Sequence, residues 1–141
     1  MATLFVDTSA FYALADRTDR HRADALAAFQ TCATDDLTTT DHVVVETWLL
    51  ICSRLGRPAA MGFWDAFESE LIVIVGVSAQ DLRRSREIAR AWPDQAFSLV
   101  DCTSFAVIER LGIRRAFAFD KHFGVFRFGS WRRQALEIVP H

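Results

Sequence analysis

Residues 71–77, which read LIVIVGV, are the feature that most narrows the choice of fold. Their apolar side chains follow one another directly, without the alternation expected of a strand that has one wet face. An unbroken run of this kind is typical of a strand buried on both faces of a parallel sheet. We therefore expect this strand to lie within a sheet that carries helices on both sides.

Strand and helix patterns alternate along the rest of the chain. Short apolar runs rich in strand-forming residues predict further strands at 3–7, 37–40, 115–120 and 135–139. Helical spacing, capping residues and stops at Gly or Pro predict helices at 8–16, 19–33, 41–56, 58–70, 78–92 and 98–112. The alternation predicts an α/β fold, a three-layer sandwich with a mostly parallel central sheet.

Length and charge limit the protein class. A chain of 141 residues suits a single domain spanning residues 1–141, and no secretory leader or membrane span is recognisable, so we expect a cytoplasmic protein. The net charge is only −2, but residues 1–70 hold 11 acids and 5 bases, whereas residues 71–141 hold 7 acids and 11 bases. The basic half indicates either a solvated basic face or a phosphate-bearing or acidic partner.

Four carboxylates fall at positions that the fold brings to one edge of the sheet. Asp7 ends the first predicted strand, Asp120 ends the strand at 115–120, and Asp101 lies in the first turn of a helix. Glu46 is the one acid in an otherwise apolar helical run. In open α/β sheets, ligands bind beyond the carboxyl ends of the strands, so these acids could converge there.

Each acid also has a purely structural interpretation. Asp7 could cap the helix after it, Asp101 could belong to a capping box, Asp120 could begin a turn, and Glu46 could be a lone charge on a helix face. Together they are harder to explain in this way, because carboxylates that meet in an apolar setting repel one another. A hard divalent cation removes that repulsion, which predicts Mg²⁺ or Mn²⁺.

Other chemistries fit less well. The four histidines lack the spacing of zinc ligands, and no glycine-rich nucleotide cradle or serine-nucleophile motif is present. The aromatic residues are expected to fill the core or an interface. For Trp131, which lies between Gly129-Ser130 and Arg132-Arg133, stacking on a nucleic-acid base is the alternative.

The acids lie in four segments that together resemble a known family: LFVDTSAFYAL, TTDHVVVETWLL, LVDCTSFAVIERLGI and AFAFDKHF. They resemble the PIN domain and, more closely, the VapC ribonuclease toxins of bacterial VapBC toxin–antitoxin modules. The resemblance extends from about residue 3 to residue 139, with the four acids in the family's order.

The resemblance implies a metal-dependent endoribonuclease. Asp7, Glu46, Asp101 and Asp120 would be the catalytic residues and would hold Mg²⁺ or Mn²⁺. Hydrolysis would leave 5′-phosphate and 3′-hydroxyl ends. The implied partners are RNA as substrate, a small VapB-type antitoxin, a second copy of the chain in a homodimer, and promoter DNA only through the antitoxin.

Residues beside the acids are expected to assist them. Ser9 and Thr103 would orient the carboxylates. Arg132 and Arg133, in the basic final third, would contact the RNA backbone, so reversing their charge should weaken RNA binding.

Three rival interpretations remain open. A phospho-receiver domain also gathers acids at strand ends, but Asp7 is followed by Thr8 and Ser9 rather than by an acid, and LIVIVGV ends without an aspartate. A PIN-fold binding module with a spent active site is the second rival. The third is a PIN-fold processing nuclease that is not a toxin.

Overall fold

Five of the strands form one parallel sheet. The protein is described here from a computed structural model that covers residues 3–69, 71–129 and 132–141. The strands of the sheet are β1 (Thr3–Val6), β2 (Asp36–Thr40), β3 (Ile72–Val75), β4 (Arg115–Phe117) and β7 (Glu137–Val139). They lie in the order β3-β2-β1-β4-β7, and each neighbouring pair is parallel. The predicted α/β class and mostly parallel sheet are confirmed.

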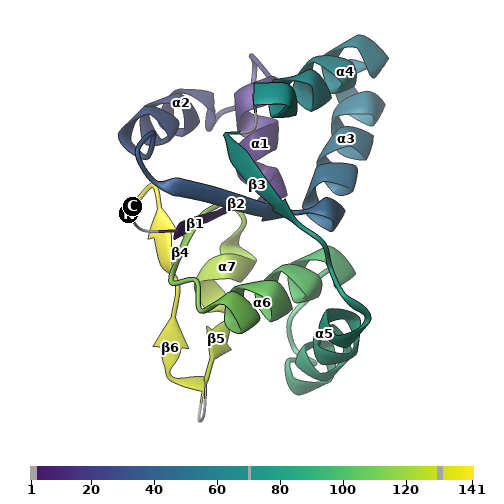
Figure 1. Cartoon of the computed structure of the whole chain (residues 1–141), viewed down its shortest axis with the longest axis vertical. Coiled ribbons are helices and arrows are strands. Elements are labelled where there is room, and N and C mark those ends of the chain that lie inside the picture. The colour runs from purple at the N-terminus through teal and green to yellow at the C-terminus, as the bar shows by residue number, and fades with distance from the viewer. Residues whose placement is uncertain (1–2, 70, 130–131) are drawn as a thin grey trace.

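Helices cover both faces of the sheet, which gives the predicted three layers (Figure 1). One layer holds α1 (Thr8–Ala15), α2 (Arg22–Thr31), α3 (Asp41–Leu55) and α4 (Arg57–Asp65). The other holds α5 (Ala79–Ala91), α6 (Leu99–Leu111) and α7 (Lys121–Val125). Gly56 and Gly112, the predicted helix stops, follow α3 and α6 with positive φ angles of 96° and 65°, a conformation that glycine adopts without strain.

Aromatic side chains fill the core beneath the carboxyl edge of the sheet. Phe105 of α6 stacks on Phe126, with ring centroids 4.2 Å apart, and meets Phe123 of α7 edge-on. Phe5 of β1 and Phe117 of β4 are also fully buried. This cluster fixes the relative positions of β1, β4, α6 and α7, from which three of the four acids project.

The expectation that residues 71–77 form a doubly buried strand is wrong. β3 lies at the edge of the sheet, and in the described structure Leu71 and Val73 are 72% and 59% exposed. Ile72 packs against the core. The apolar run is unbroken because this edge strand carries apolar side chains on its solvent side as well as on its core side. In such a case hydrophobic periodicity alone does not distinguish an edge strand from a central one.

Several element boundaries differ from the predictions. The helix expected at 58–70 ends at Asp65 and continues as a 3₁₀ turn, η1 (Ala66–Ser69). The strand expected at 135–139 is divided between β6 (Gln134–Ala135) and β7, and β6 pairs antiparallel with β5 (Arg127–Phe128). Trp131 lies outside the described residues. Within the described ranges, no helix has both the length and the apolar character needed to cross a bilayer.

Candidate metal centre

Three of the four acids cap helices. Asp7 follows β1 and accepts the N–H of Ser9 at the start of α1. Asp101 and Ser98 form a reciprocal capping box at the start of α6, and Asp120 accepts the N–H of His122 at the start of α7. The structural roles considered from the sequence are therefore real. The starts of α1, α6 and α7, which carry a partial positive charge, therefore lie at these three acids.

Ser9 joins the ends of β1 and β4. Its hydroxyl donates to Oδ2 of Asp7 at 2.7 Å and accepts the backbone N–H groups of Phe119 at 2.9 Å and Asp120 at 3.2 Å. One side chain thus orients the first carboxylate and holds the segment that carries the fourth.

Glu46 reaches the same region from α3. The hydroxyl of Thr8 donates to Oε1 of Glu46 at 2.7 Å, which ties the α3 acid to the residue that follows Asp7. Sequence reasoning missed Thr8. The only available signal was that its position next to Asp7 places it at the same edge of the sheet.

His122 is the second residue that the sequence analysis missed. Its Nδ1 lies 2.9 Å from Oδ2 of Asp101 and 3.3 Å from Oδ1 of Asp120, and the edge of its ring meets Phe97. Asp101, Asp120 and His122 each offer one potential metal-ligand atom, and these three atoms lie within 4.8 Å of one another. The available signal was its position two residues after Asp120, within one turn of a short helix.

The electrostatics of the site disfavour ionised carboxylates. Burial raises the pKa of Asp7 from 3.8 to about 7; the Ser9 hydrogen bonds oppose this rise, and the charges of Asp101 and Asp120 add to it. Burial is also the main cause of the raised pKa values of Asp101 and Glu46, and neighbouring carboxylates contribute. The hydrogen bonds of Ser9 and Thr8 tie Asp7 and Glu46 to this edge of the sheet, whereas among the described residues the close group of ligand atoms comprises Asp101, Asp120 and His122.

The donor set fits a hard divalent cation. Among the described residues, no Lys or Arg forms an ion pair with any of the four acids. Each acid also keeps one carboxylate oxygen that receives no hydrogen bond from the described residues: Oδ1 of Asp7, Oε2 of Glu46, Oδ1 of Asp101 and Oδ2 of Asp120. Converging carboxylate oxygens without a cationic side chain are the ligands that Mg²⁺ and Mn²⁺ take.

The remaining predicted site residues lie elsewhere. Thr103 is fully buried, and its hydroxyl donates to the carbonyl of Val100 rather than to a carboxylate of the site. Arg132 and Arg133 are both exposed, but only Arg132 lines a cavity, which lies between α5 and the β5–β6 hairpin.

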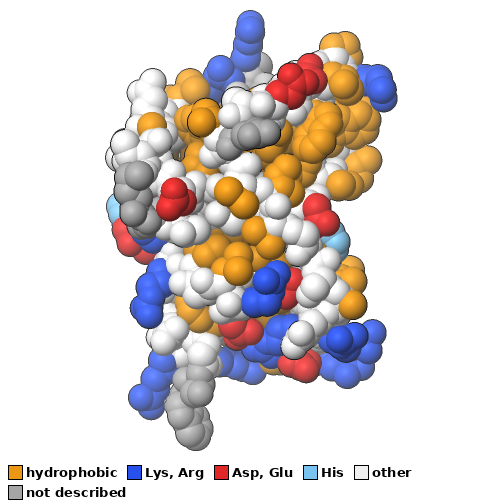
Figure 2. All heavy atoms as spheres, viewed as in Figure 1, with side chains coloured by type: hydrophobic (Ala, Val, Ile, Leu, Met, Phe, Trp, Pro, Cys, Tyr) orange, Lys and Arg blue, Asp and Glu red, His pale blue; other side chains and the backbone are white. Residues whose placement is uncertain are grey.

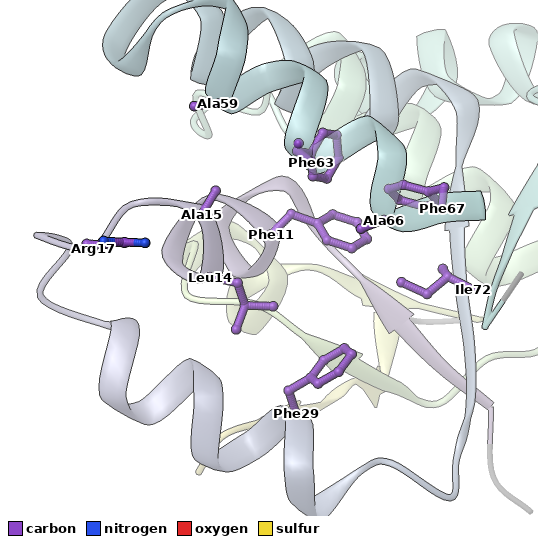
Figure 3. Close-up of a pocket in the computed structure, with 11 residues that line it drawn as sticks. Phe11, Leu14, Ala15, Arg17, Phe29, Ala59, Phe63, Ala66, Phe67 and Ile72 are labelled. Carbon is purple, nitrogen blue, oxygen red and sulfur yellow. The ribbon is translucent and has the colours of Figure 1, made fainter. Parts of the chain in front are cut away.

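An apolar cavity lies apart from the acids. It has a volume of about 490 Å³ and lies among α1, α2, α4, η1 and β3, where Phe11, Phe29, Phe63 and Phe67 point toward it (Figure 3). Its lining offers no carboxylate, imidazole or thiol, so it provides no metal ligands. A smaller hollow of about 320 Å³ adjoins the site, because Glu46 lines it.

Comparison with known proteins agrees with this geometry. The PIN domain family model matches residues 4–129. The chain is 32% identical over 125 residues to the "23S rRNA-specific endonuclease VapC20" of Mycobacterium tuberculosis strains CDC 1551 / Oshkosh and ATCC 25618 / H37Rv. That alignment covers 89% of this chain and 95% of the relative.

Solved structures show the same fold. Mycobacterium tuberculosis VapC20, described as a Sarcin-Ricin loop cleaving toxin, superposes with a TM-score of 0.81 at 31% identity, covering 86% of this chain and 93% of that one. Promoter-bound VapBC2 from Rickettsia felis matches with a TM-score of 0.71 at 12% identity, covering 96% of this chain and 98% of that one. DNA-bound VapBC from Salmonella typhimurium matches with a TM-score of 0.66 at 11% identity, covering 98% of this chain and 97% of that one. The chain belongs to the PIN-domain family, and within it to the VapC proteins.

Proposed function

We propose that this protein is a metal-dependent endoribonuclease, the toxin of a type II toxin–antitoxin module, acting on RNA in the cytoplasm through one nuclease domain spanning residues 1–141. The observation that carries the proposal is the convergence of Asp7, Glu46, Asp101 and Asp120 with no Lys or Arg paired to them in the described structure. The activity of VapC20, an endonuclease specific for 23S rRNA, makes ribosomal RNA the first candidate substrate. A PIN-fold binding or processing protein that is not a toxin is less favoured, because all four acids are present and the curated relative is an endonuclease.

The proposed chemistry is hydrolysis of a phosphodiester by water. A bound Mg²⁺ or Mn²⁺ would neutralise the carboxylates and make water a usable nucleophile near neutral pH. The four acids supply the ligand oxygens, Ser9 and Thr8 orient two of them, and His122 holds Asp101 beside Asp120. Because water attacks, the ribose 2′-hydroxyl takes no part, and the products carry 5′-phosphate and 3′-hydroxyl ends.

The proposed regulatory partner is a small VapB-type antitoxin, through which the protein would reach its promoter DNA. Support comes from membership of the VapC proteins. The Rickettsia and Salmonella structures are VapBC complexes on DNA, but at 12% and 11% identity they support the shared fold alone.

A homodimer is the proposed assembly. Figure 2 shows apolar side chains gathered over α3 and α4, and Val45 and Leu49 of α3 are 57% and 59% exposed. Both residues line the hollow beside Glu46, so a second copy on this face would border the metal site. Apolar surface of this kind on a soluble protein commonly marks an interface.

Leu49→Glu is expected to dissociate the dimer. A buried leucine contributes about 2 kcal/mol, so losing one from each of the two copies removes about 4 kcal/mol and weakens association by about a thousand-fold. Sedimentation equilibrium measures the change. Leu26→Glu, on α2, is the matched control, because Leu26 is a similarly exposed leucine (42%) away from this face. Equal dimer affinities for the two variants would contradict the proposed interface.

The proposed function is tested by inducing the wild type and Asp101→Asn in a bacterial host while RNA 5′ ends are mapped. We expect only the wild type to arrest growth and to create new 5′-phosphate ends at a few sites. Co-expression of the antitoxin encoded beside the gene should remove both effects. If the two proteins behaved alike, the nuclease proposal would be wrong for any RNA that this host contains.

A further inference from the structure

A second cavity, lined by cationic side chains, lies between α5 and the β5–β6 hairpin. It has a volume of about 330 Å³, and Arg84, Arg127, Arg132 and Trp92 are among its lining residues. Its size lies at the lower end of the ~300–1,000 Å³ typical of ligand pockets. Figure 2 shows basic side chains gathered at the end of the molecule that holds α5 and the hairpin, whereas the opposite end shows more apolar surface.

Arg132 is held in place at a conformational cost. Its φ angle is 52°, in the left-handed region, and it is the one non-glycine residue with a positive φ in the described structure. Such a backbone costs on the order of 1–3 kcal/mol, and strained residues of this kind cluster at functional sites. Its guanidinium lies 4.8 Å from the ring centroid of Trp92 and donates from Nη2 to the carbonyl of Ala91 at 2.8 Å. The side chain is thereby fixed at the cavity wall with one face against Trp92.

Two of the three arginines are not paired with a carboxylate. Arg84 is neutralised by acids, since all three of its guanidinium nitrogens donate to them: Nε and Nη2 to Glu109 and Nη1 to Glu87. Arg127 uses only Nη1, on three backbone carbonyls at 124–126, and Arg132 uses only Nη2. Among the described residues, neither Arg127 nor Arg132 forms an ion pair with a carboxylate. The cavity therefore presents free N–H donors and uncompensated positive charge.

The cavity is connected to the metal centre by two ring contacts. The ring of Trp92 lies 5.9 Å from that of Phe97, and Phe97 meets His122 at 5.1 Å, both measured between centroids. His122 in turn contacts Asp101 and Asp120. The cavity therefore lies on the same side of the core as His122 and the two acids that it contacts.

We propose that this cavity binds another phosphate of the RNA strand that is cleaved, an inference that rests on the proposed nuclease function. Arg127 and Arg132 would donate to the phosphate, because a guanidinium fork matches its oxygens. The face of Arg132 turned away from Trp92 would carry the adjoining base, since RNA bases stack on guanidinium planes. The site also attracts the strand to a nuclease whose own carboxylates repel phosphate.

The test measures binding of a short fluorescein-labelled RNA hairpin with an unpaired loop, by anisotropy, in an Asp101→Asn background that does not cleave it. Arg132→Gln is expected to weaken binding about tenfold and to reduce the slope of log affinity against log salt by about one. Arg90→Gln is the matched control. It removes the same charge from an exposed arginine of α5 that does not line the cavity, and should change binding by less than about twofold.

Further variants separate the outcomes. Arg132→Lys keeps the charge and loses the fork, so it should bind with intermediate affinity, and thermal melts check that each variant folds. Equal RNA affinities for Arg132→Gln and Arg90→Gln would overturn the proposed phosphate site. Weaker antitoxin binding by Arg132→Gln with unchanged RNA binding would also overturn it, and would assign the cavity to an acidic protein partner. If the protein without these arginine changes neither bound nor cleaved RNA, the nuclease proposal itself would fail.

Discussion

Replacing Asp101 by asparagine is expected to slow RNA cleavage by about a thousand-fold or more while leaving the fold intact. A metal-bound site supplies several kcal/mol of charge stabilisation, and about 4 kcal/mol corresponds to a factor of a thousand in rate. Asparagine can still accept the N–H of Ser98, so the start of α6 keeps its cap. Removing a carboxylate whose pKa is raised by burial also relieves an unfavourable charge.

Asp81 provides a matched control in the same motif. It occupies the same position of a capping box at the start of α5 and is equally buried, but Arg110 binds it through Nε and Nη2, both at 2.9 Å. That ion pair lowers the pKa of Asp81, whereas burial raises that of Asp101. Asp81→Asn should therefore lower the free energy of unfolding and keep the cleavage activity.

The two variants thus separate a structural acid from a functional one. Cleavage rates on purified RNA and urea unfolding curves measure both properties for each protein. If Asp101→Asn destabilised the protein as much as Asp81→Asn and kept the wild-type cleavage rate, Asp101 would be a helix cap and nothing more.

Metal-free wild-type protein is expected to lose stability as the pH rises from about 4 to about 7. Asp7 ionises near 3.8 in the unfolded chain but near 7 in the folded protein, because burial disfavours its charge. Between these values the folded state holds a proton that the unfolded state has released, so each rise in pH favours unfolding. Each unit of raised pKa corresponds to about 1.4 kcal/mol.

Asp7→Asn should remove most of this dependence. Asparagine caps a helix about as well as aspartate, so α1 keeps its start while the buried charge is gone. In EDTA at pH 7 to 8, the variant should then be more stable than the wild type, and the difference should vanish near pH 4. Urea unfolding across this range measures the free energy directly.

Added metal gives the complementary result. Mg²⁺ or Mn²⁺ binds the folded state and should stabilise the wild type near neutral pH, with a much smaller effect on Asp7→Asn. Asp81→Asn should show the opposite pH trend, losing its difference from the wild type as the pH falls, because the Asp81 pKa is lowered. A metal-free Asp7→Asn protein less stable than the wild type at pH 8 would contradict the account of a strained carboxylate cluster.

The convergence of the acids could be predicted because it follows from topology. In a parallel sheet the carboxyl ends of neighbouring strands share an edge, and β1 and β4 are neighbours. The sequence placed Asp7 and Asp120 at those two ends and Asp101 at a helix start. The capping motifs are equally visible in the sequence, and the structure confirms the capping role of these three acids.

What could not be predicted depends on side-chain direction and on strand order. The apolar run of β3 looked central, but the order of strands is a tertiary property, and β3 is at the edge. The bond of Thr8 to Glu46 joins residues 38 positions apart, and no local pattern indicates it. Arg132 and Arg133 are adjacent and chemically identical, and tertiary features of Arg132 distinguish them: its positive φ, its contacts with Trp92 and Ala91, and the cavity that it lines.

The most direct test of the central claim is cleavage of purified 23S rRNA by purified protein during titration with Mg²⁺ or Mn²⁺, with the new 5′ ends mapped and their phosphorylation determined. We expect discrete cuts that carry 5′-phosphates, vanish in EDTA, return with either metal and are absent for Asp101→Asn. Cuts that persist in EDTA, or that leave 5′-hydroxyl ends, would contradict a carboxylate-bound metal and water as the nucleophile.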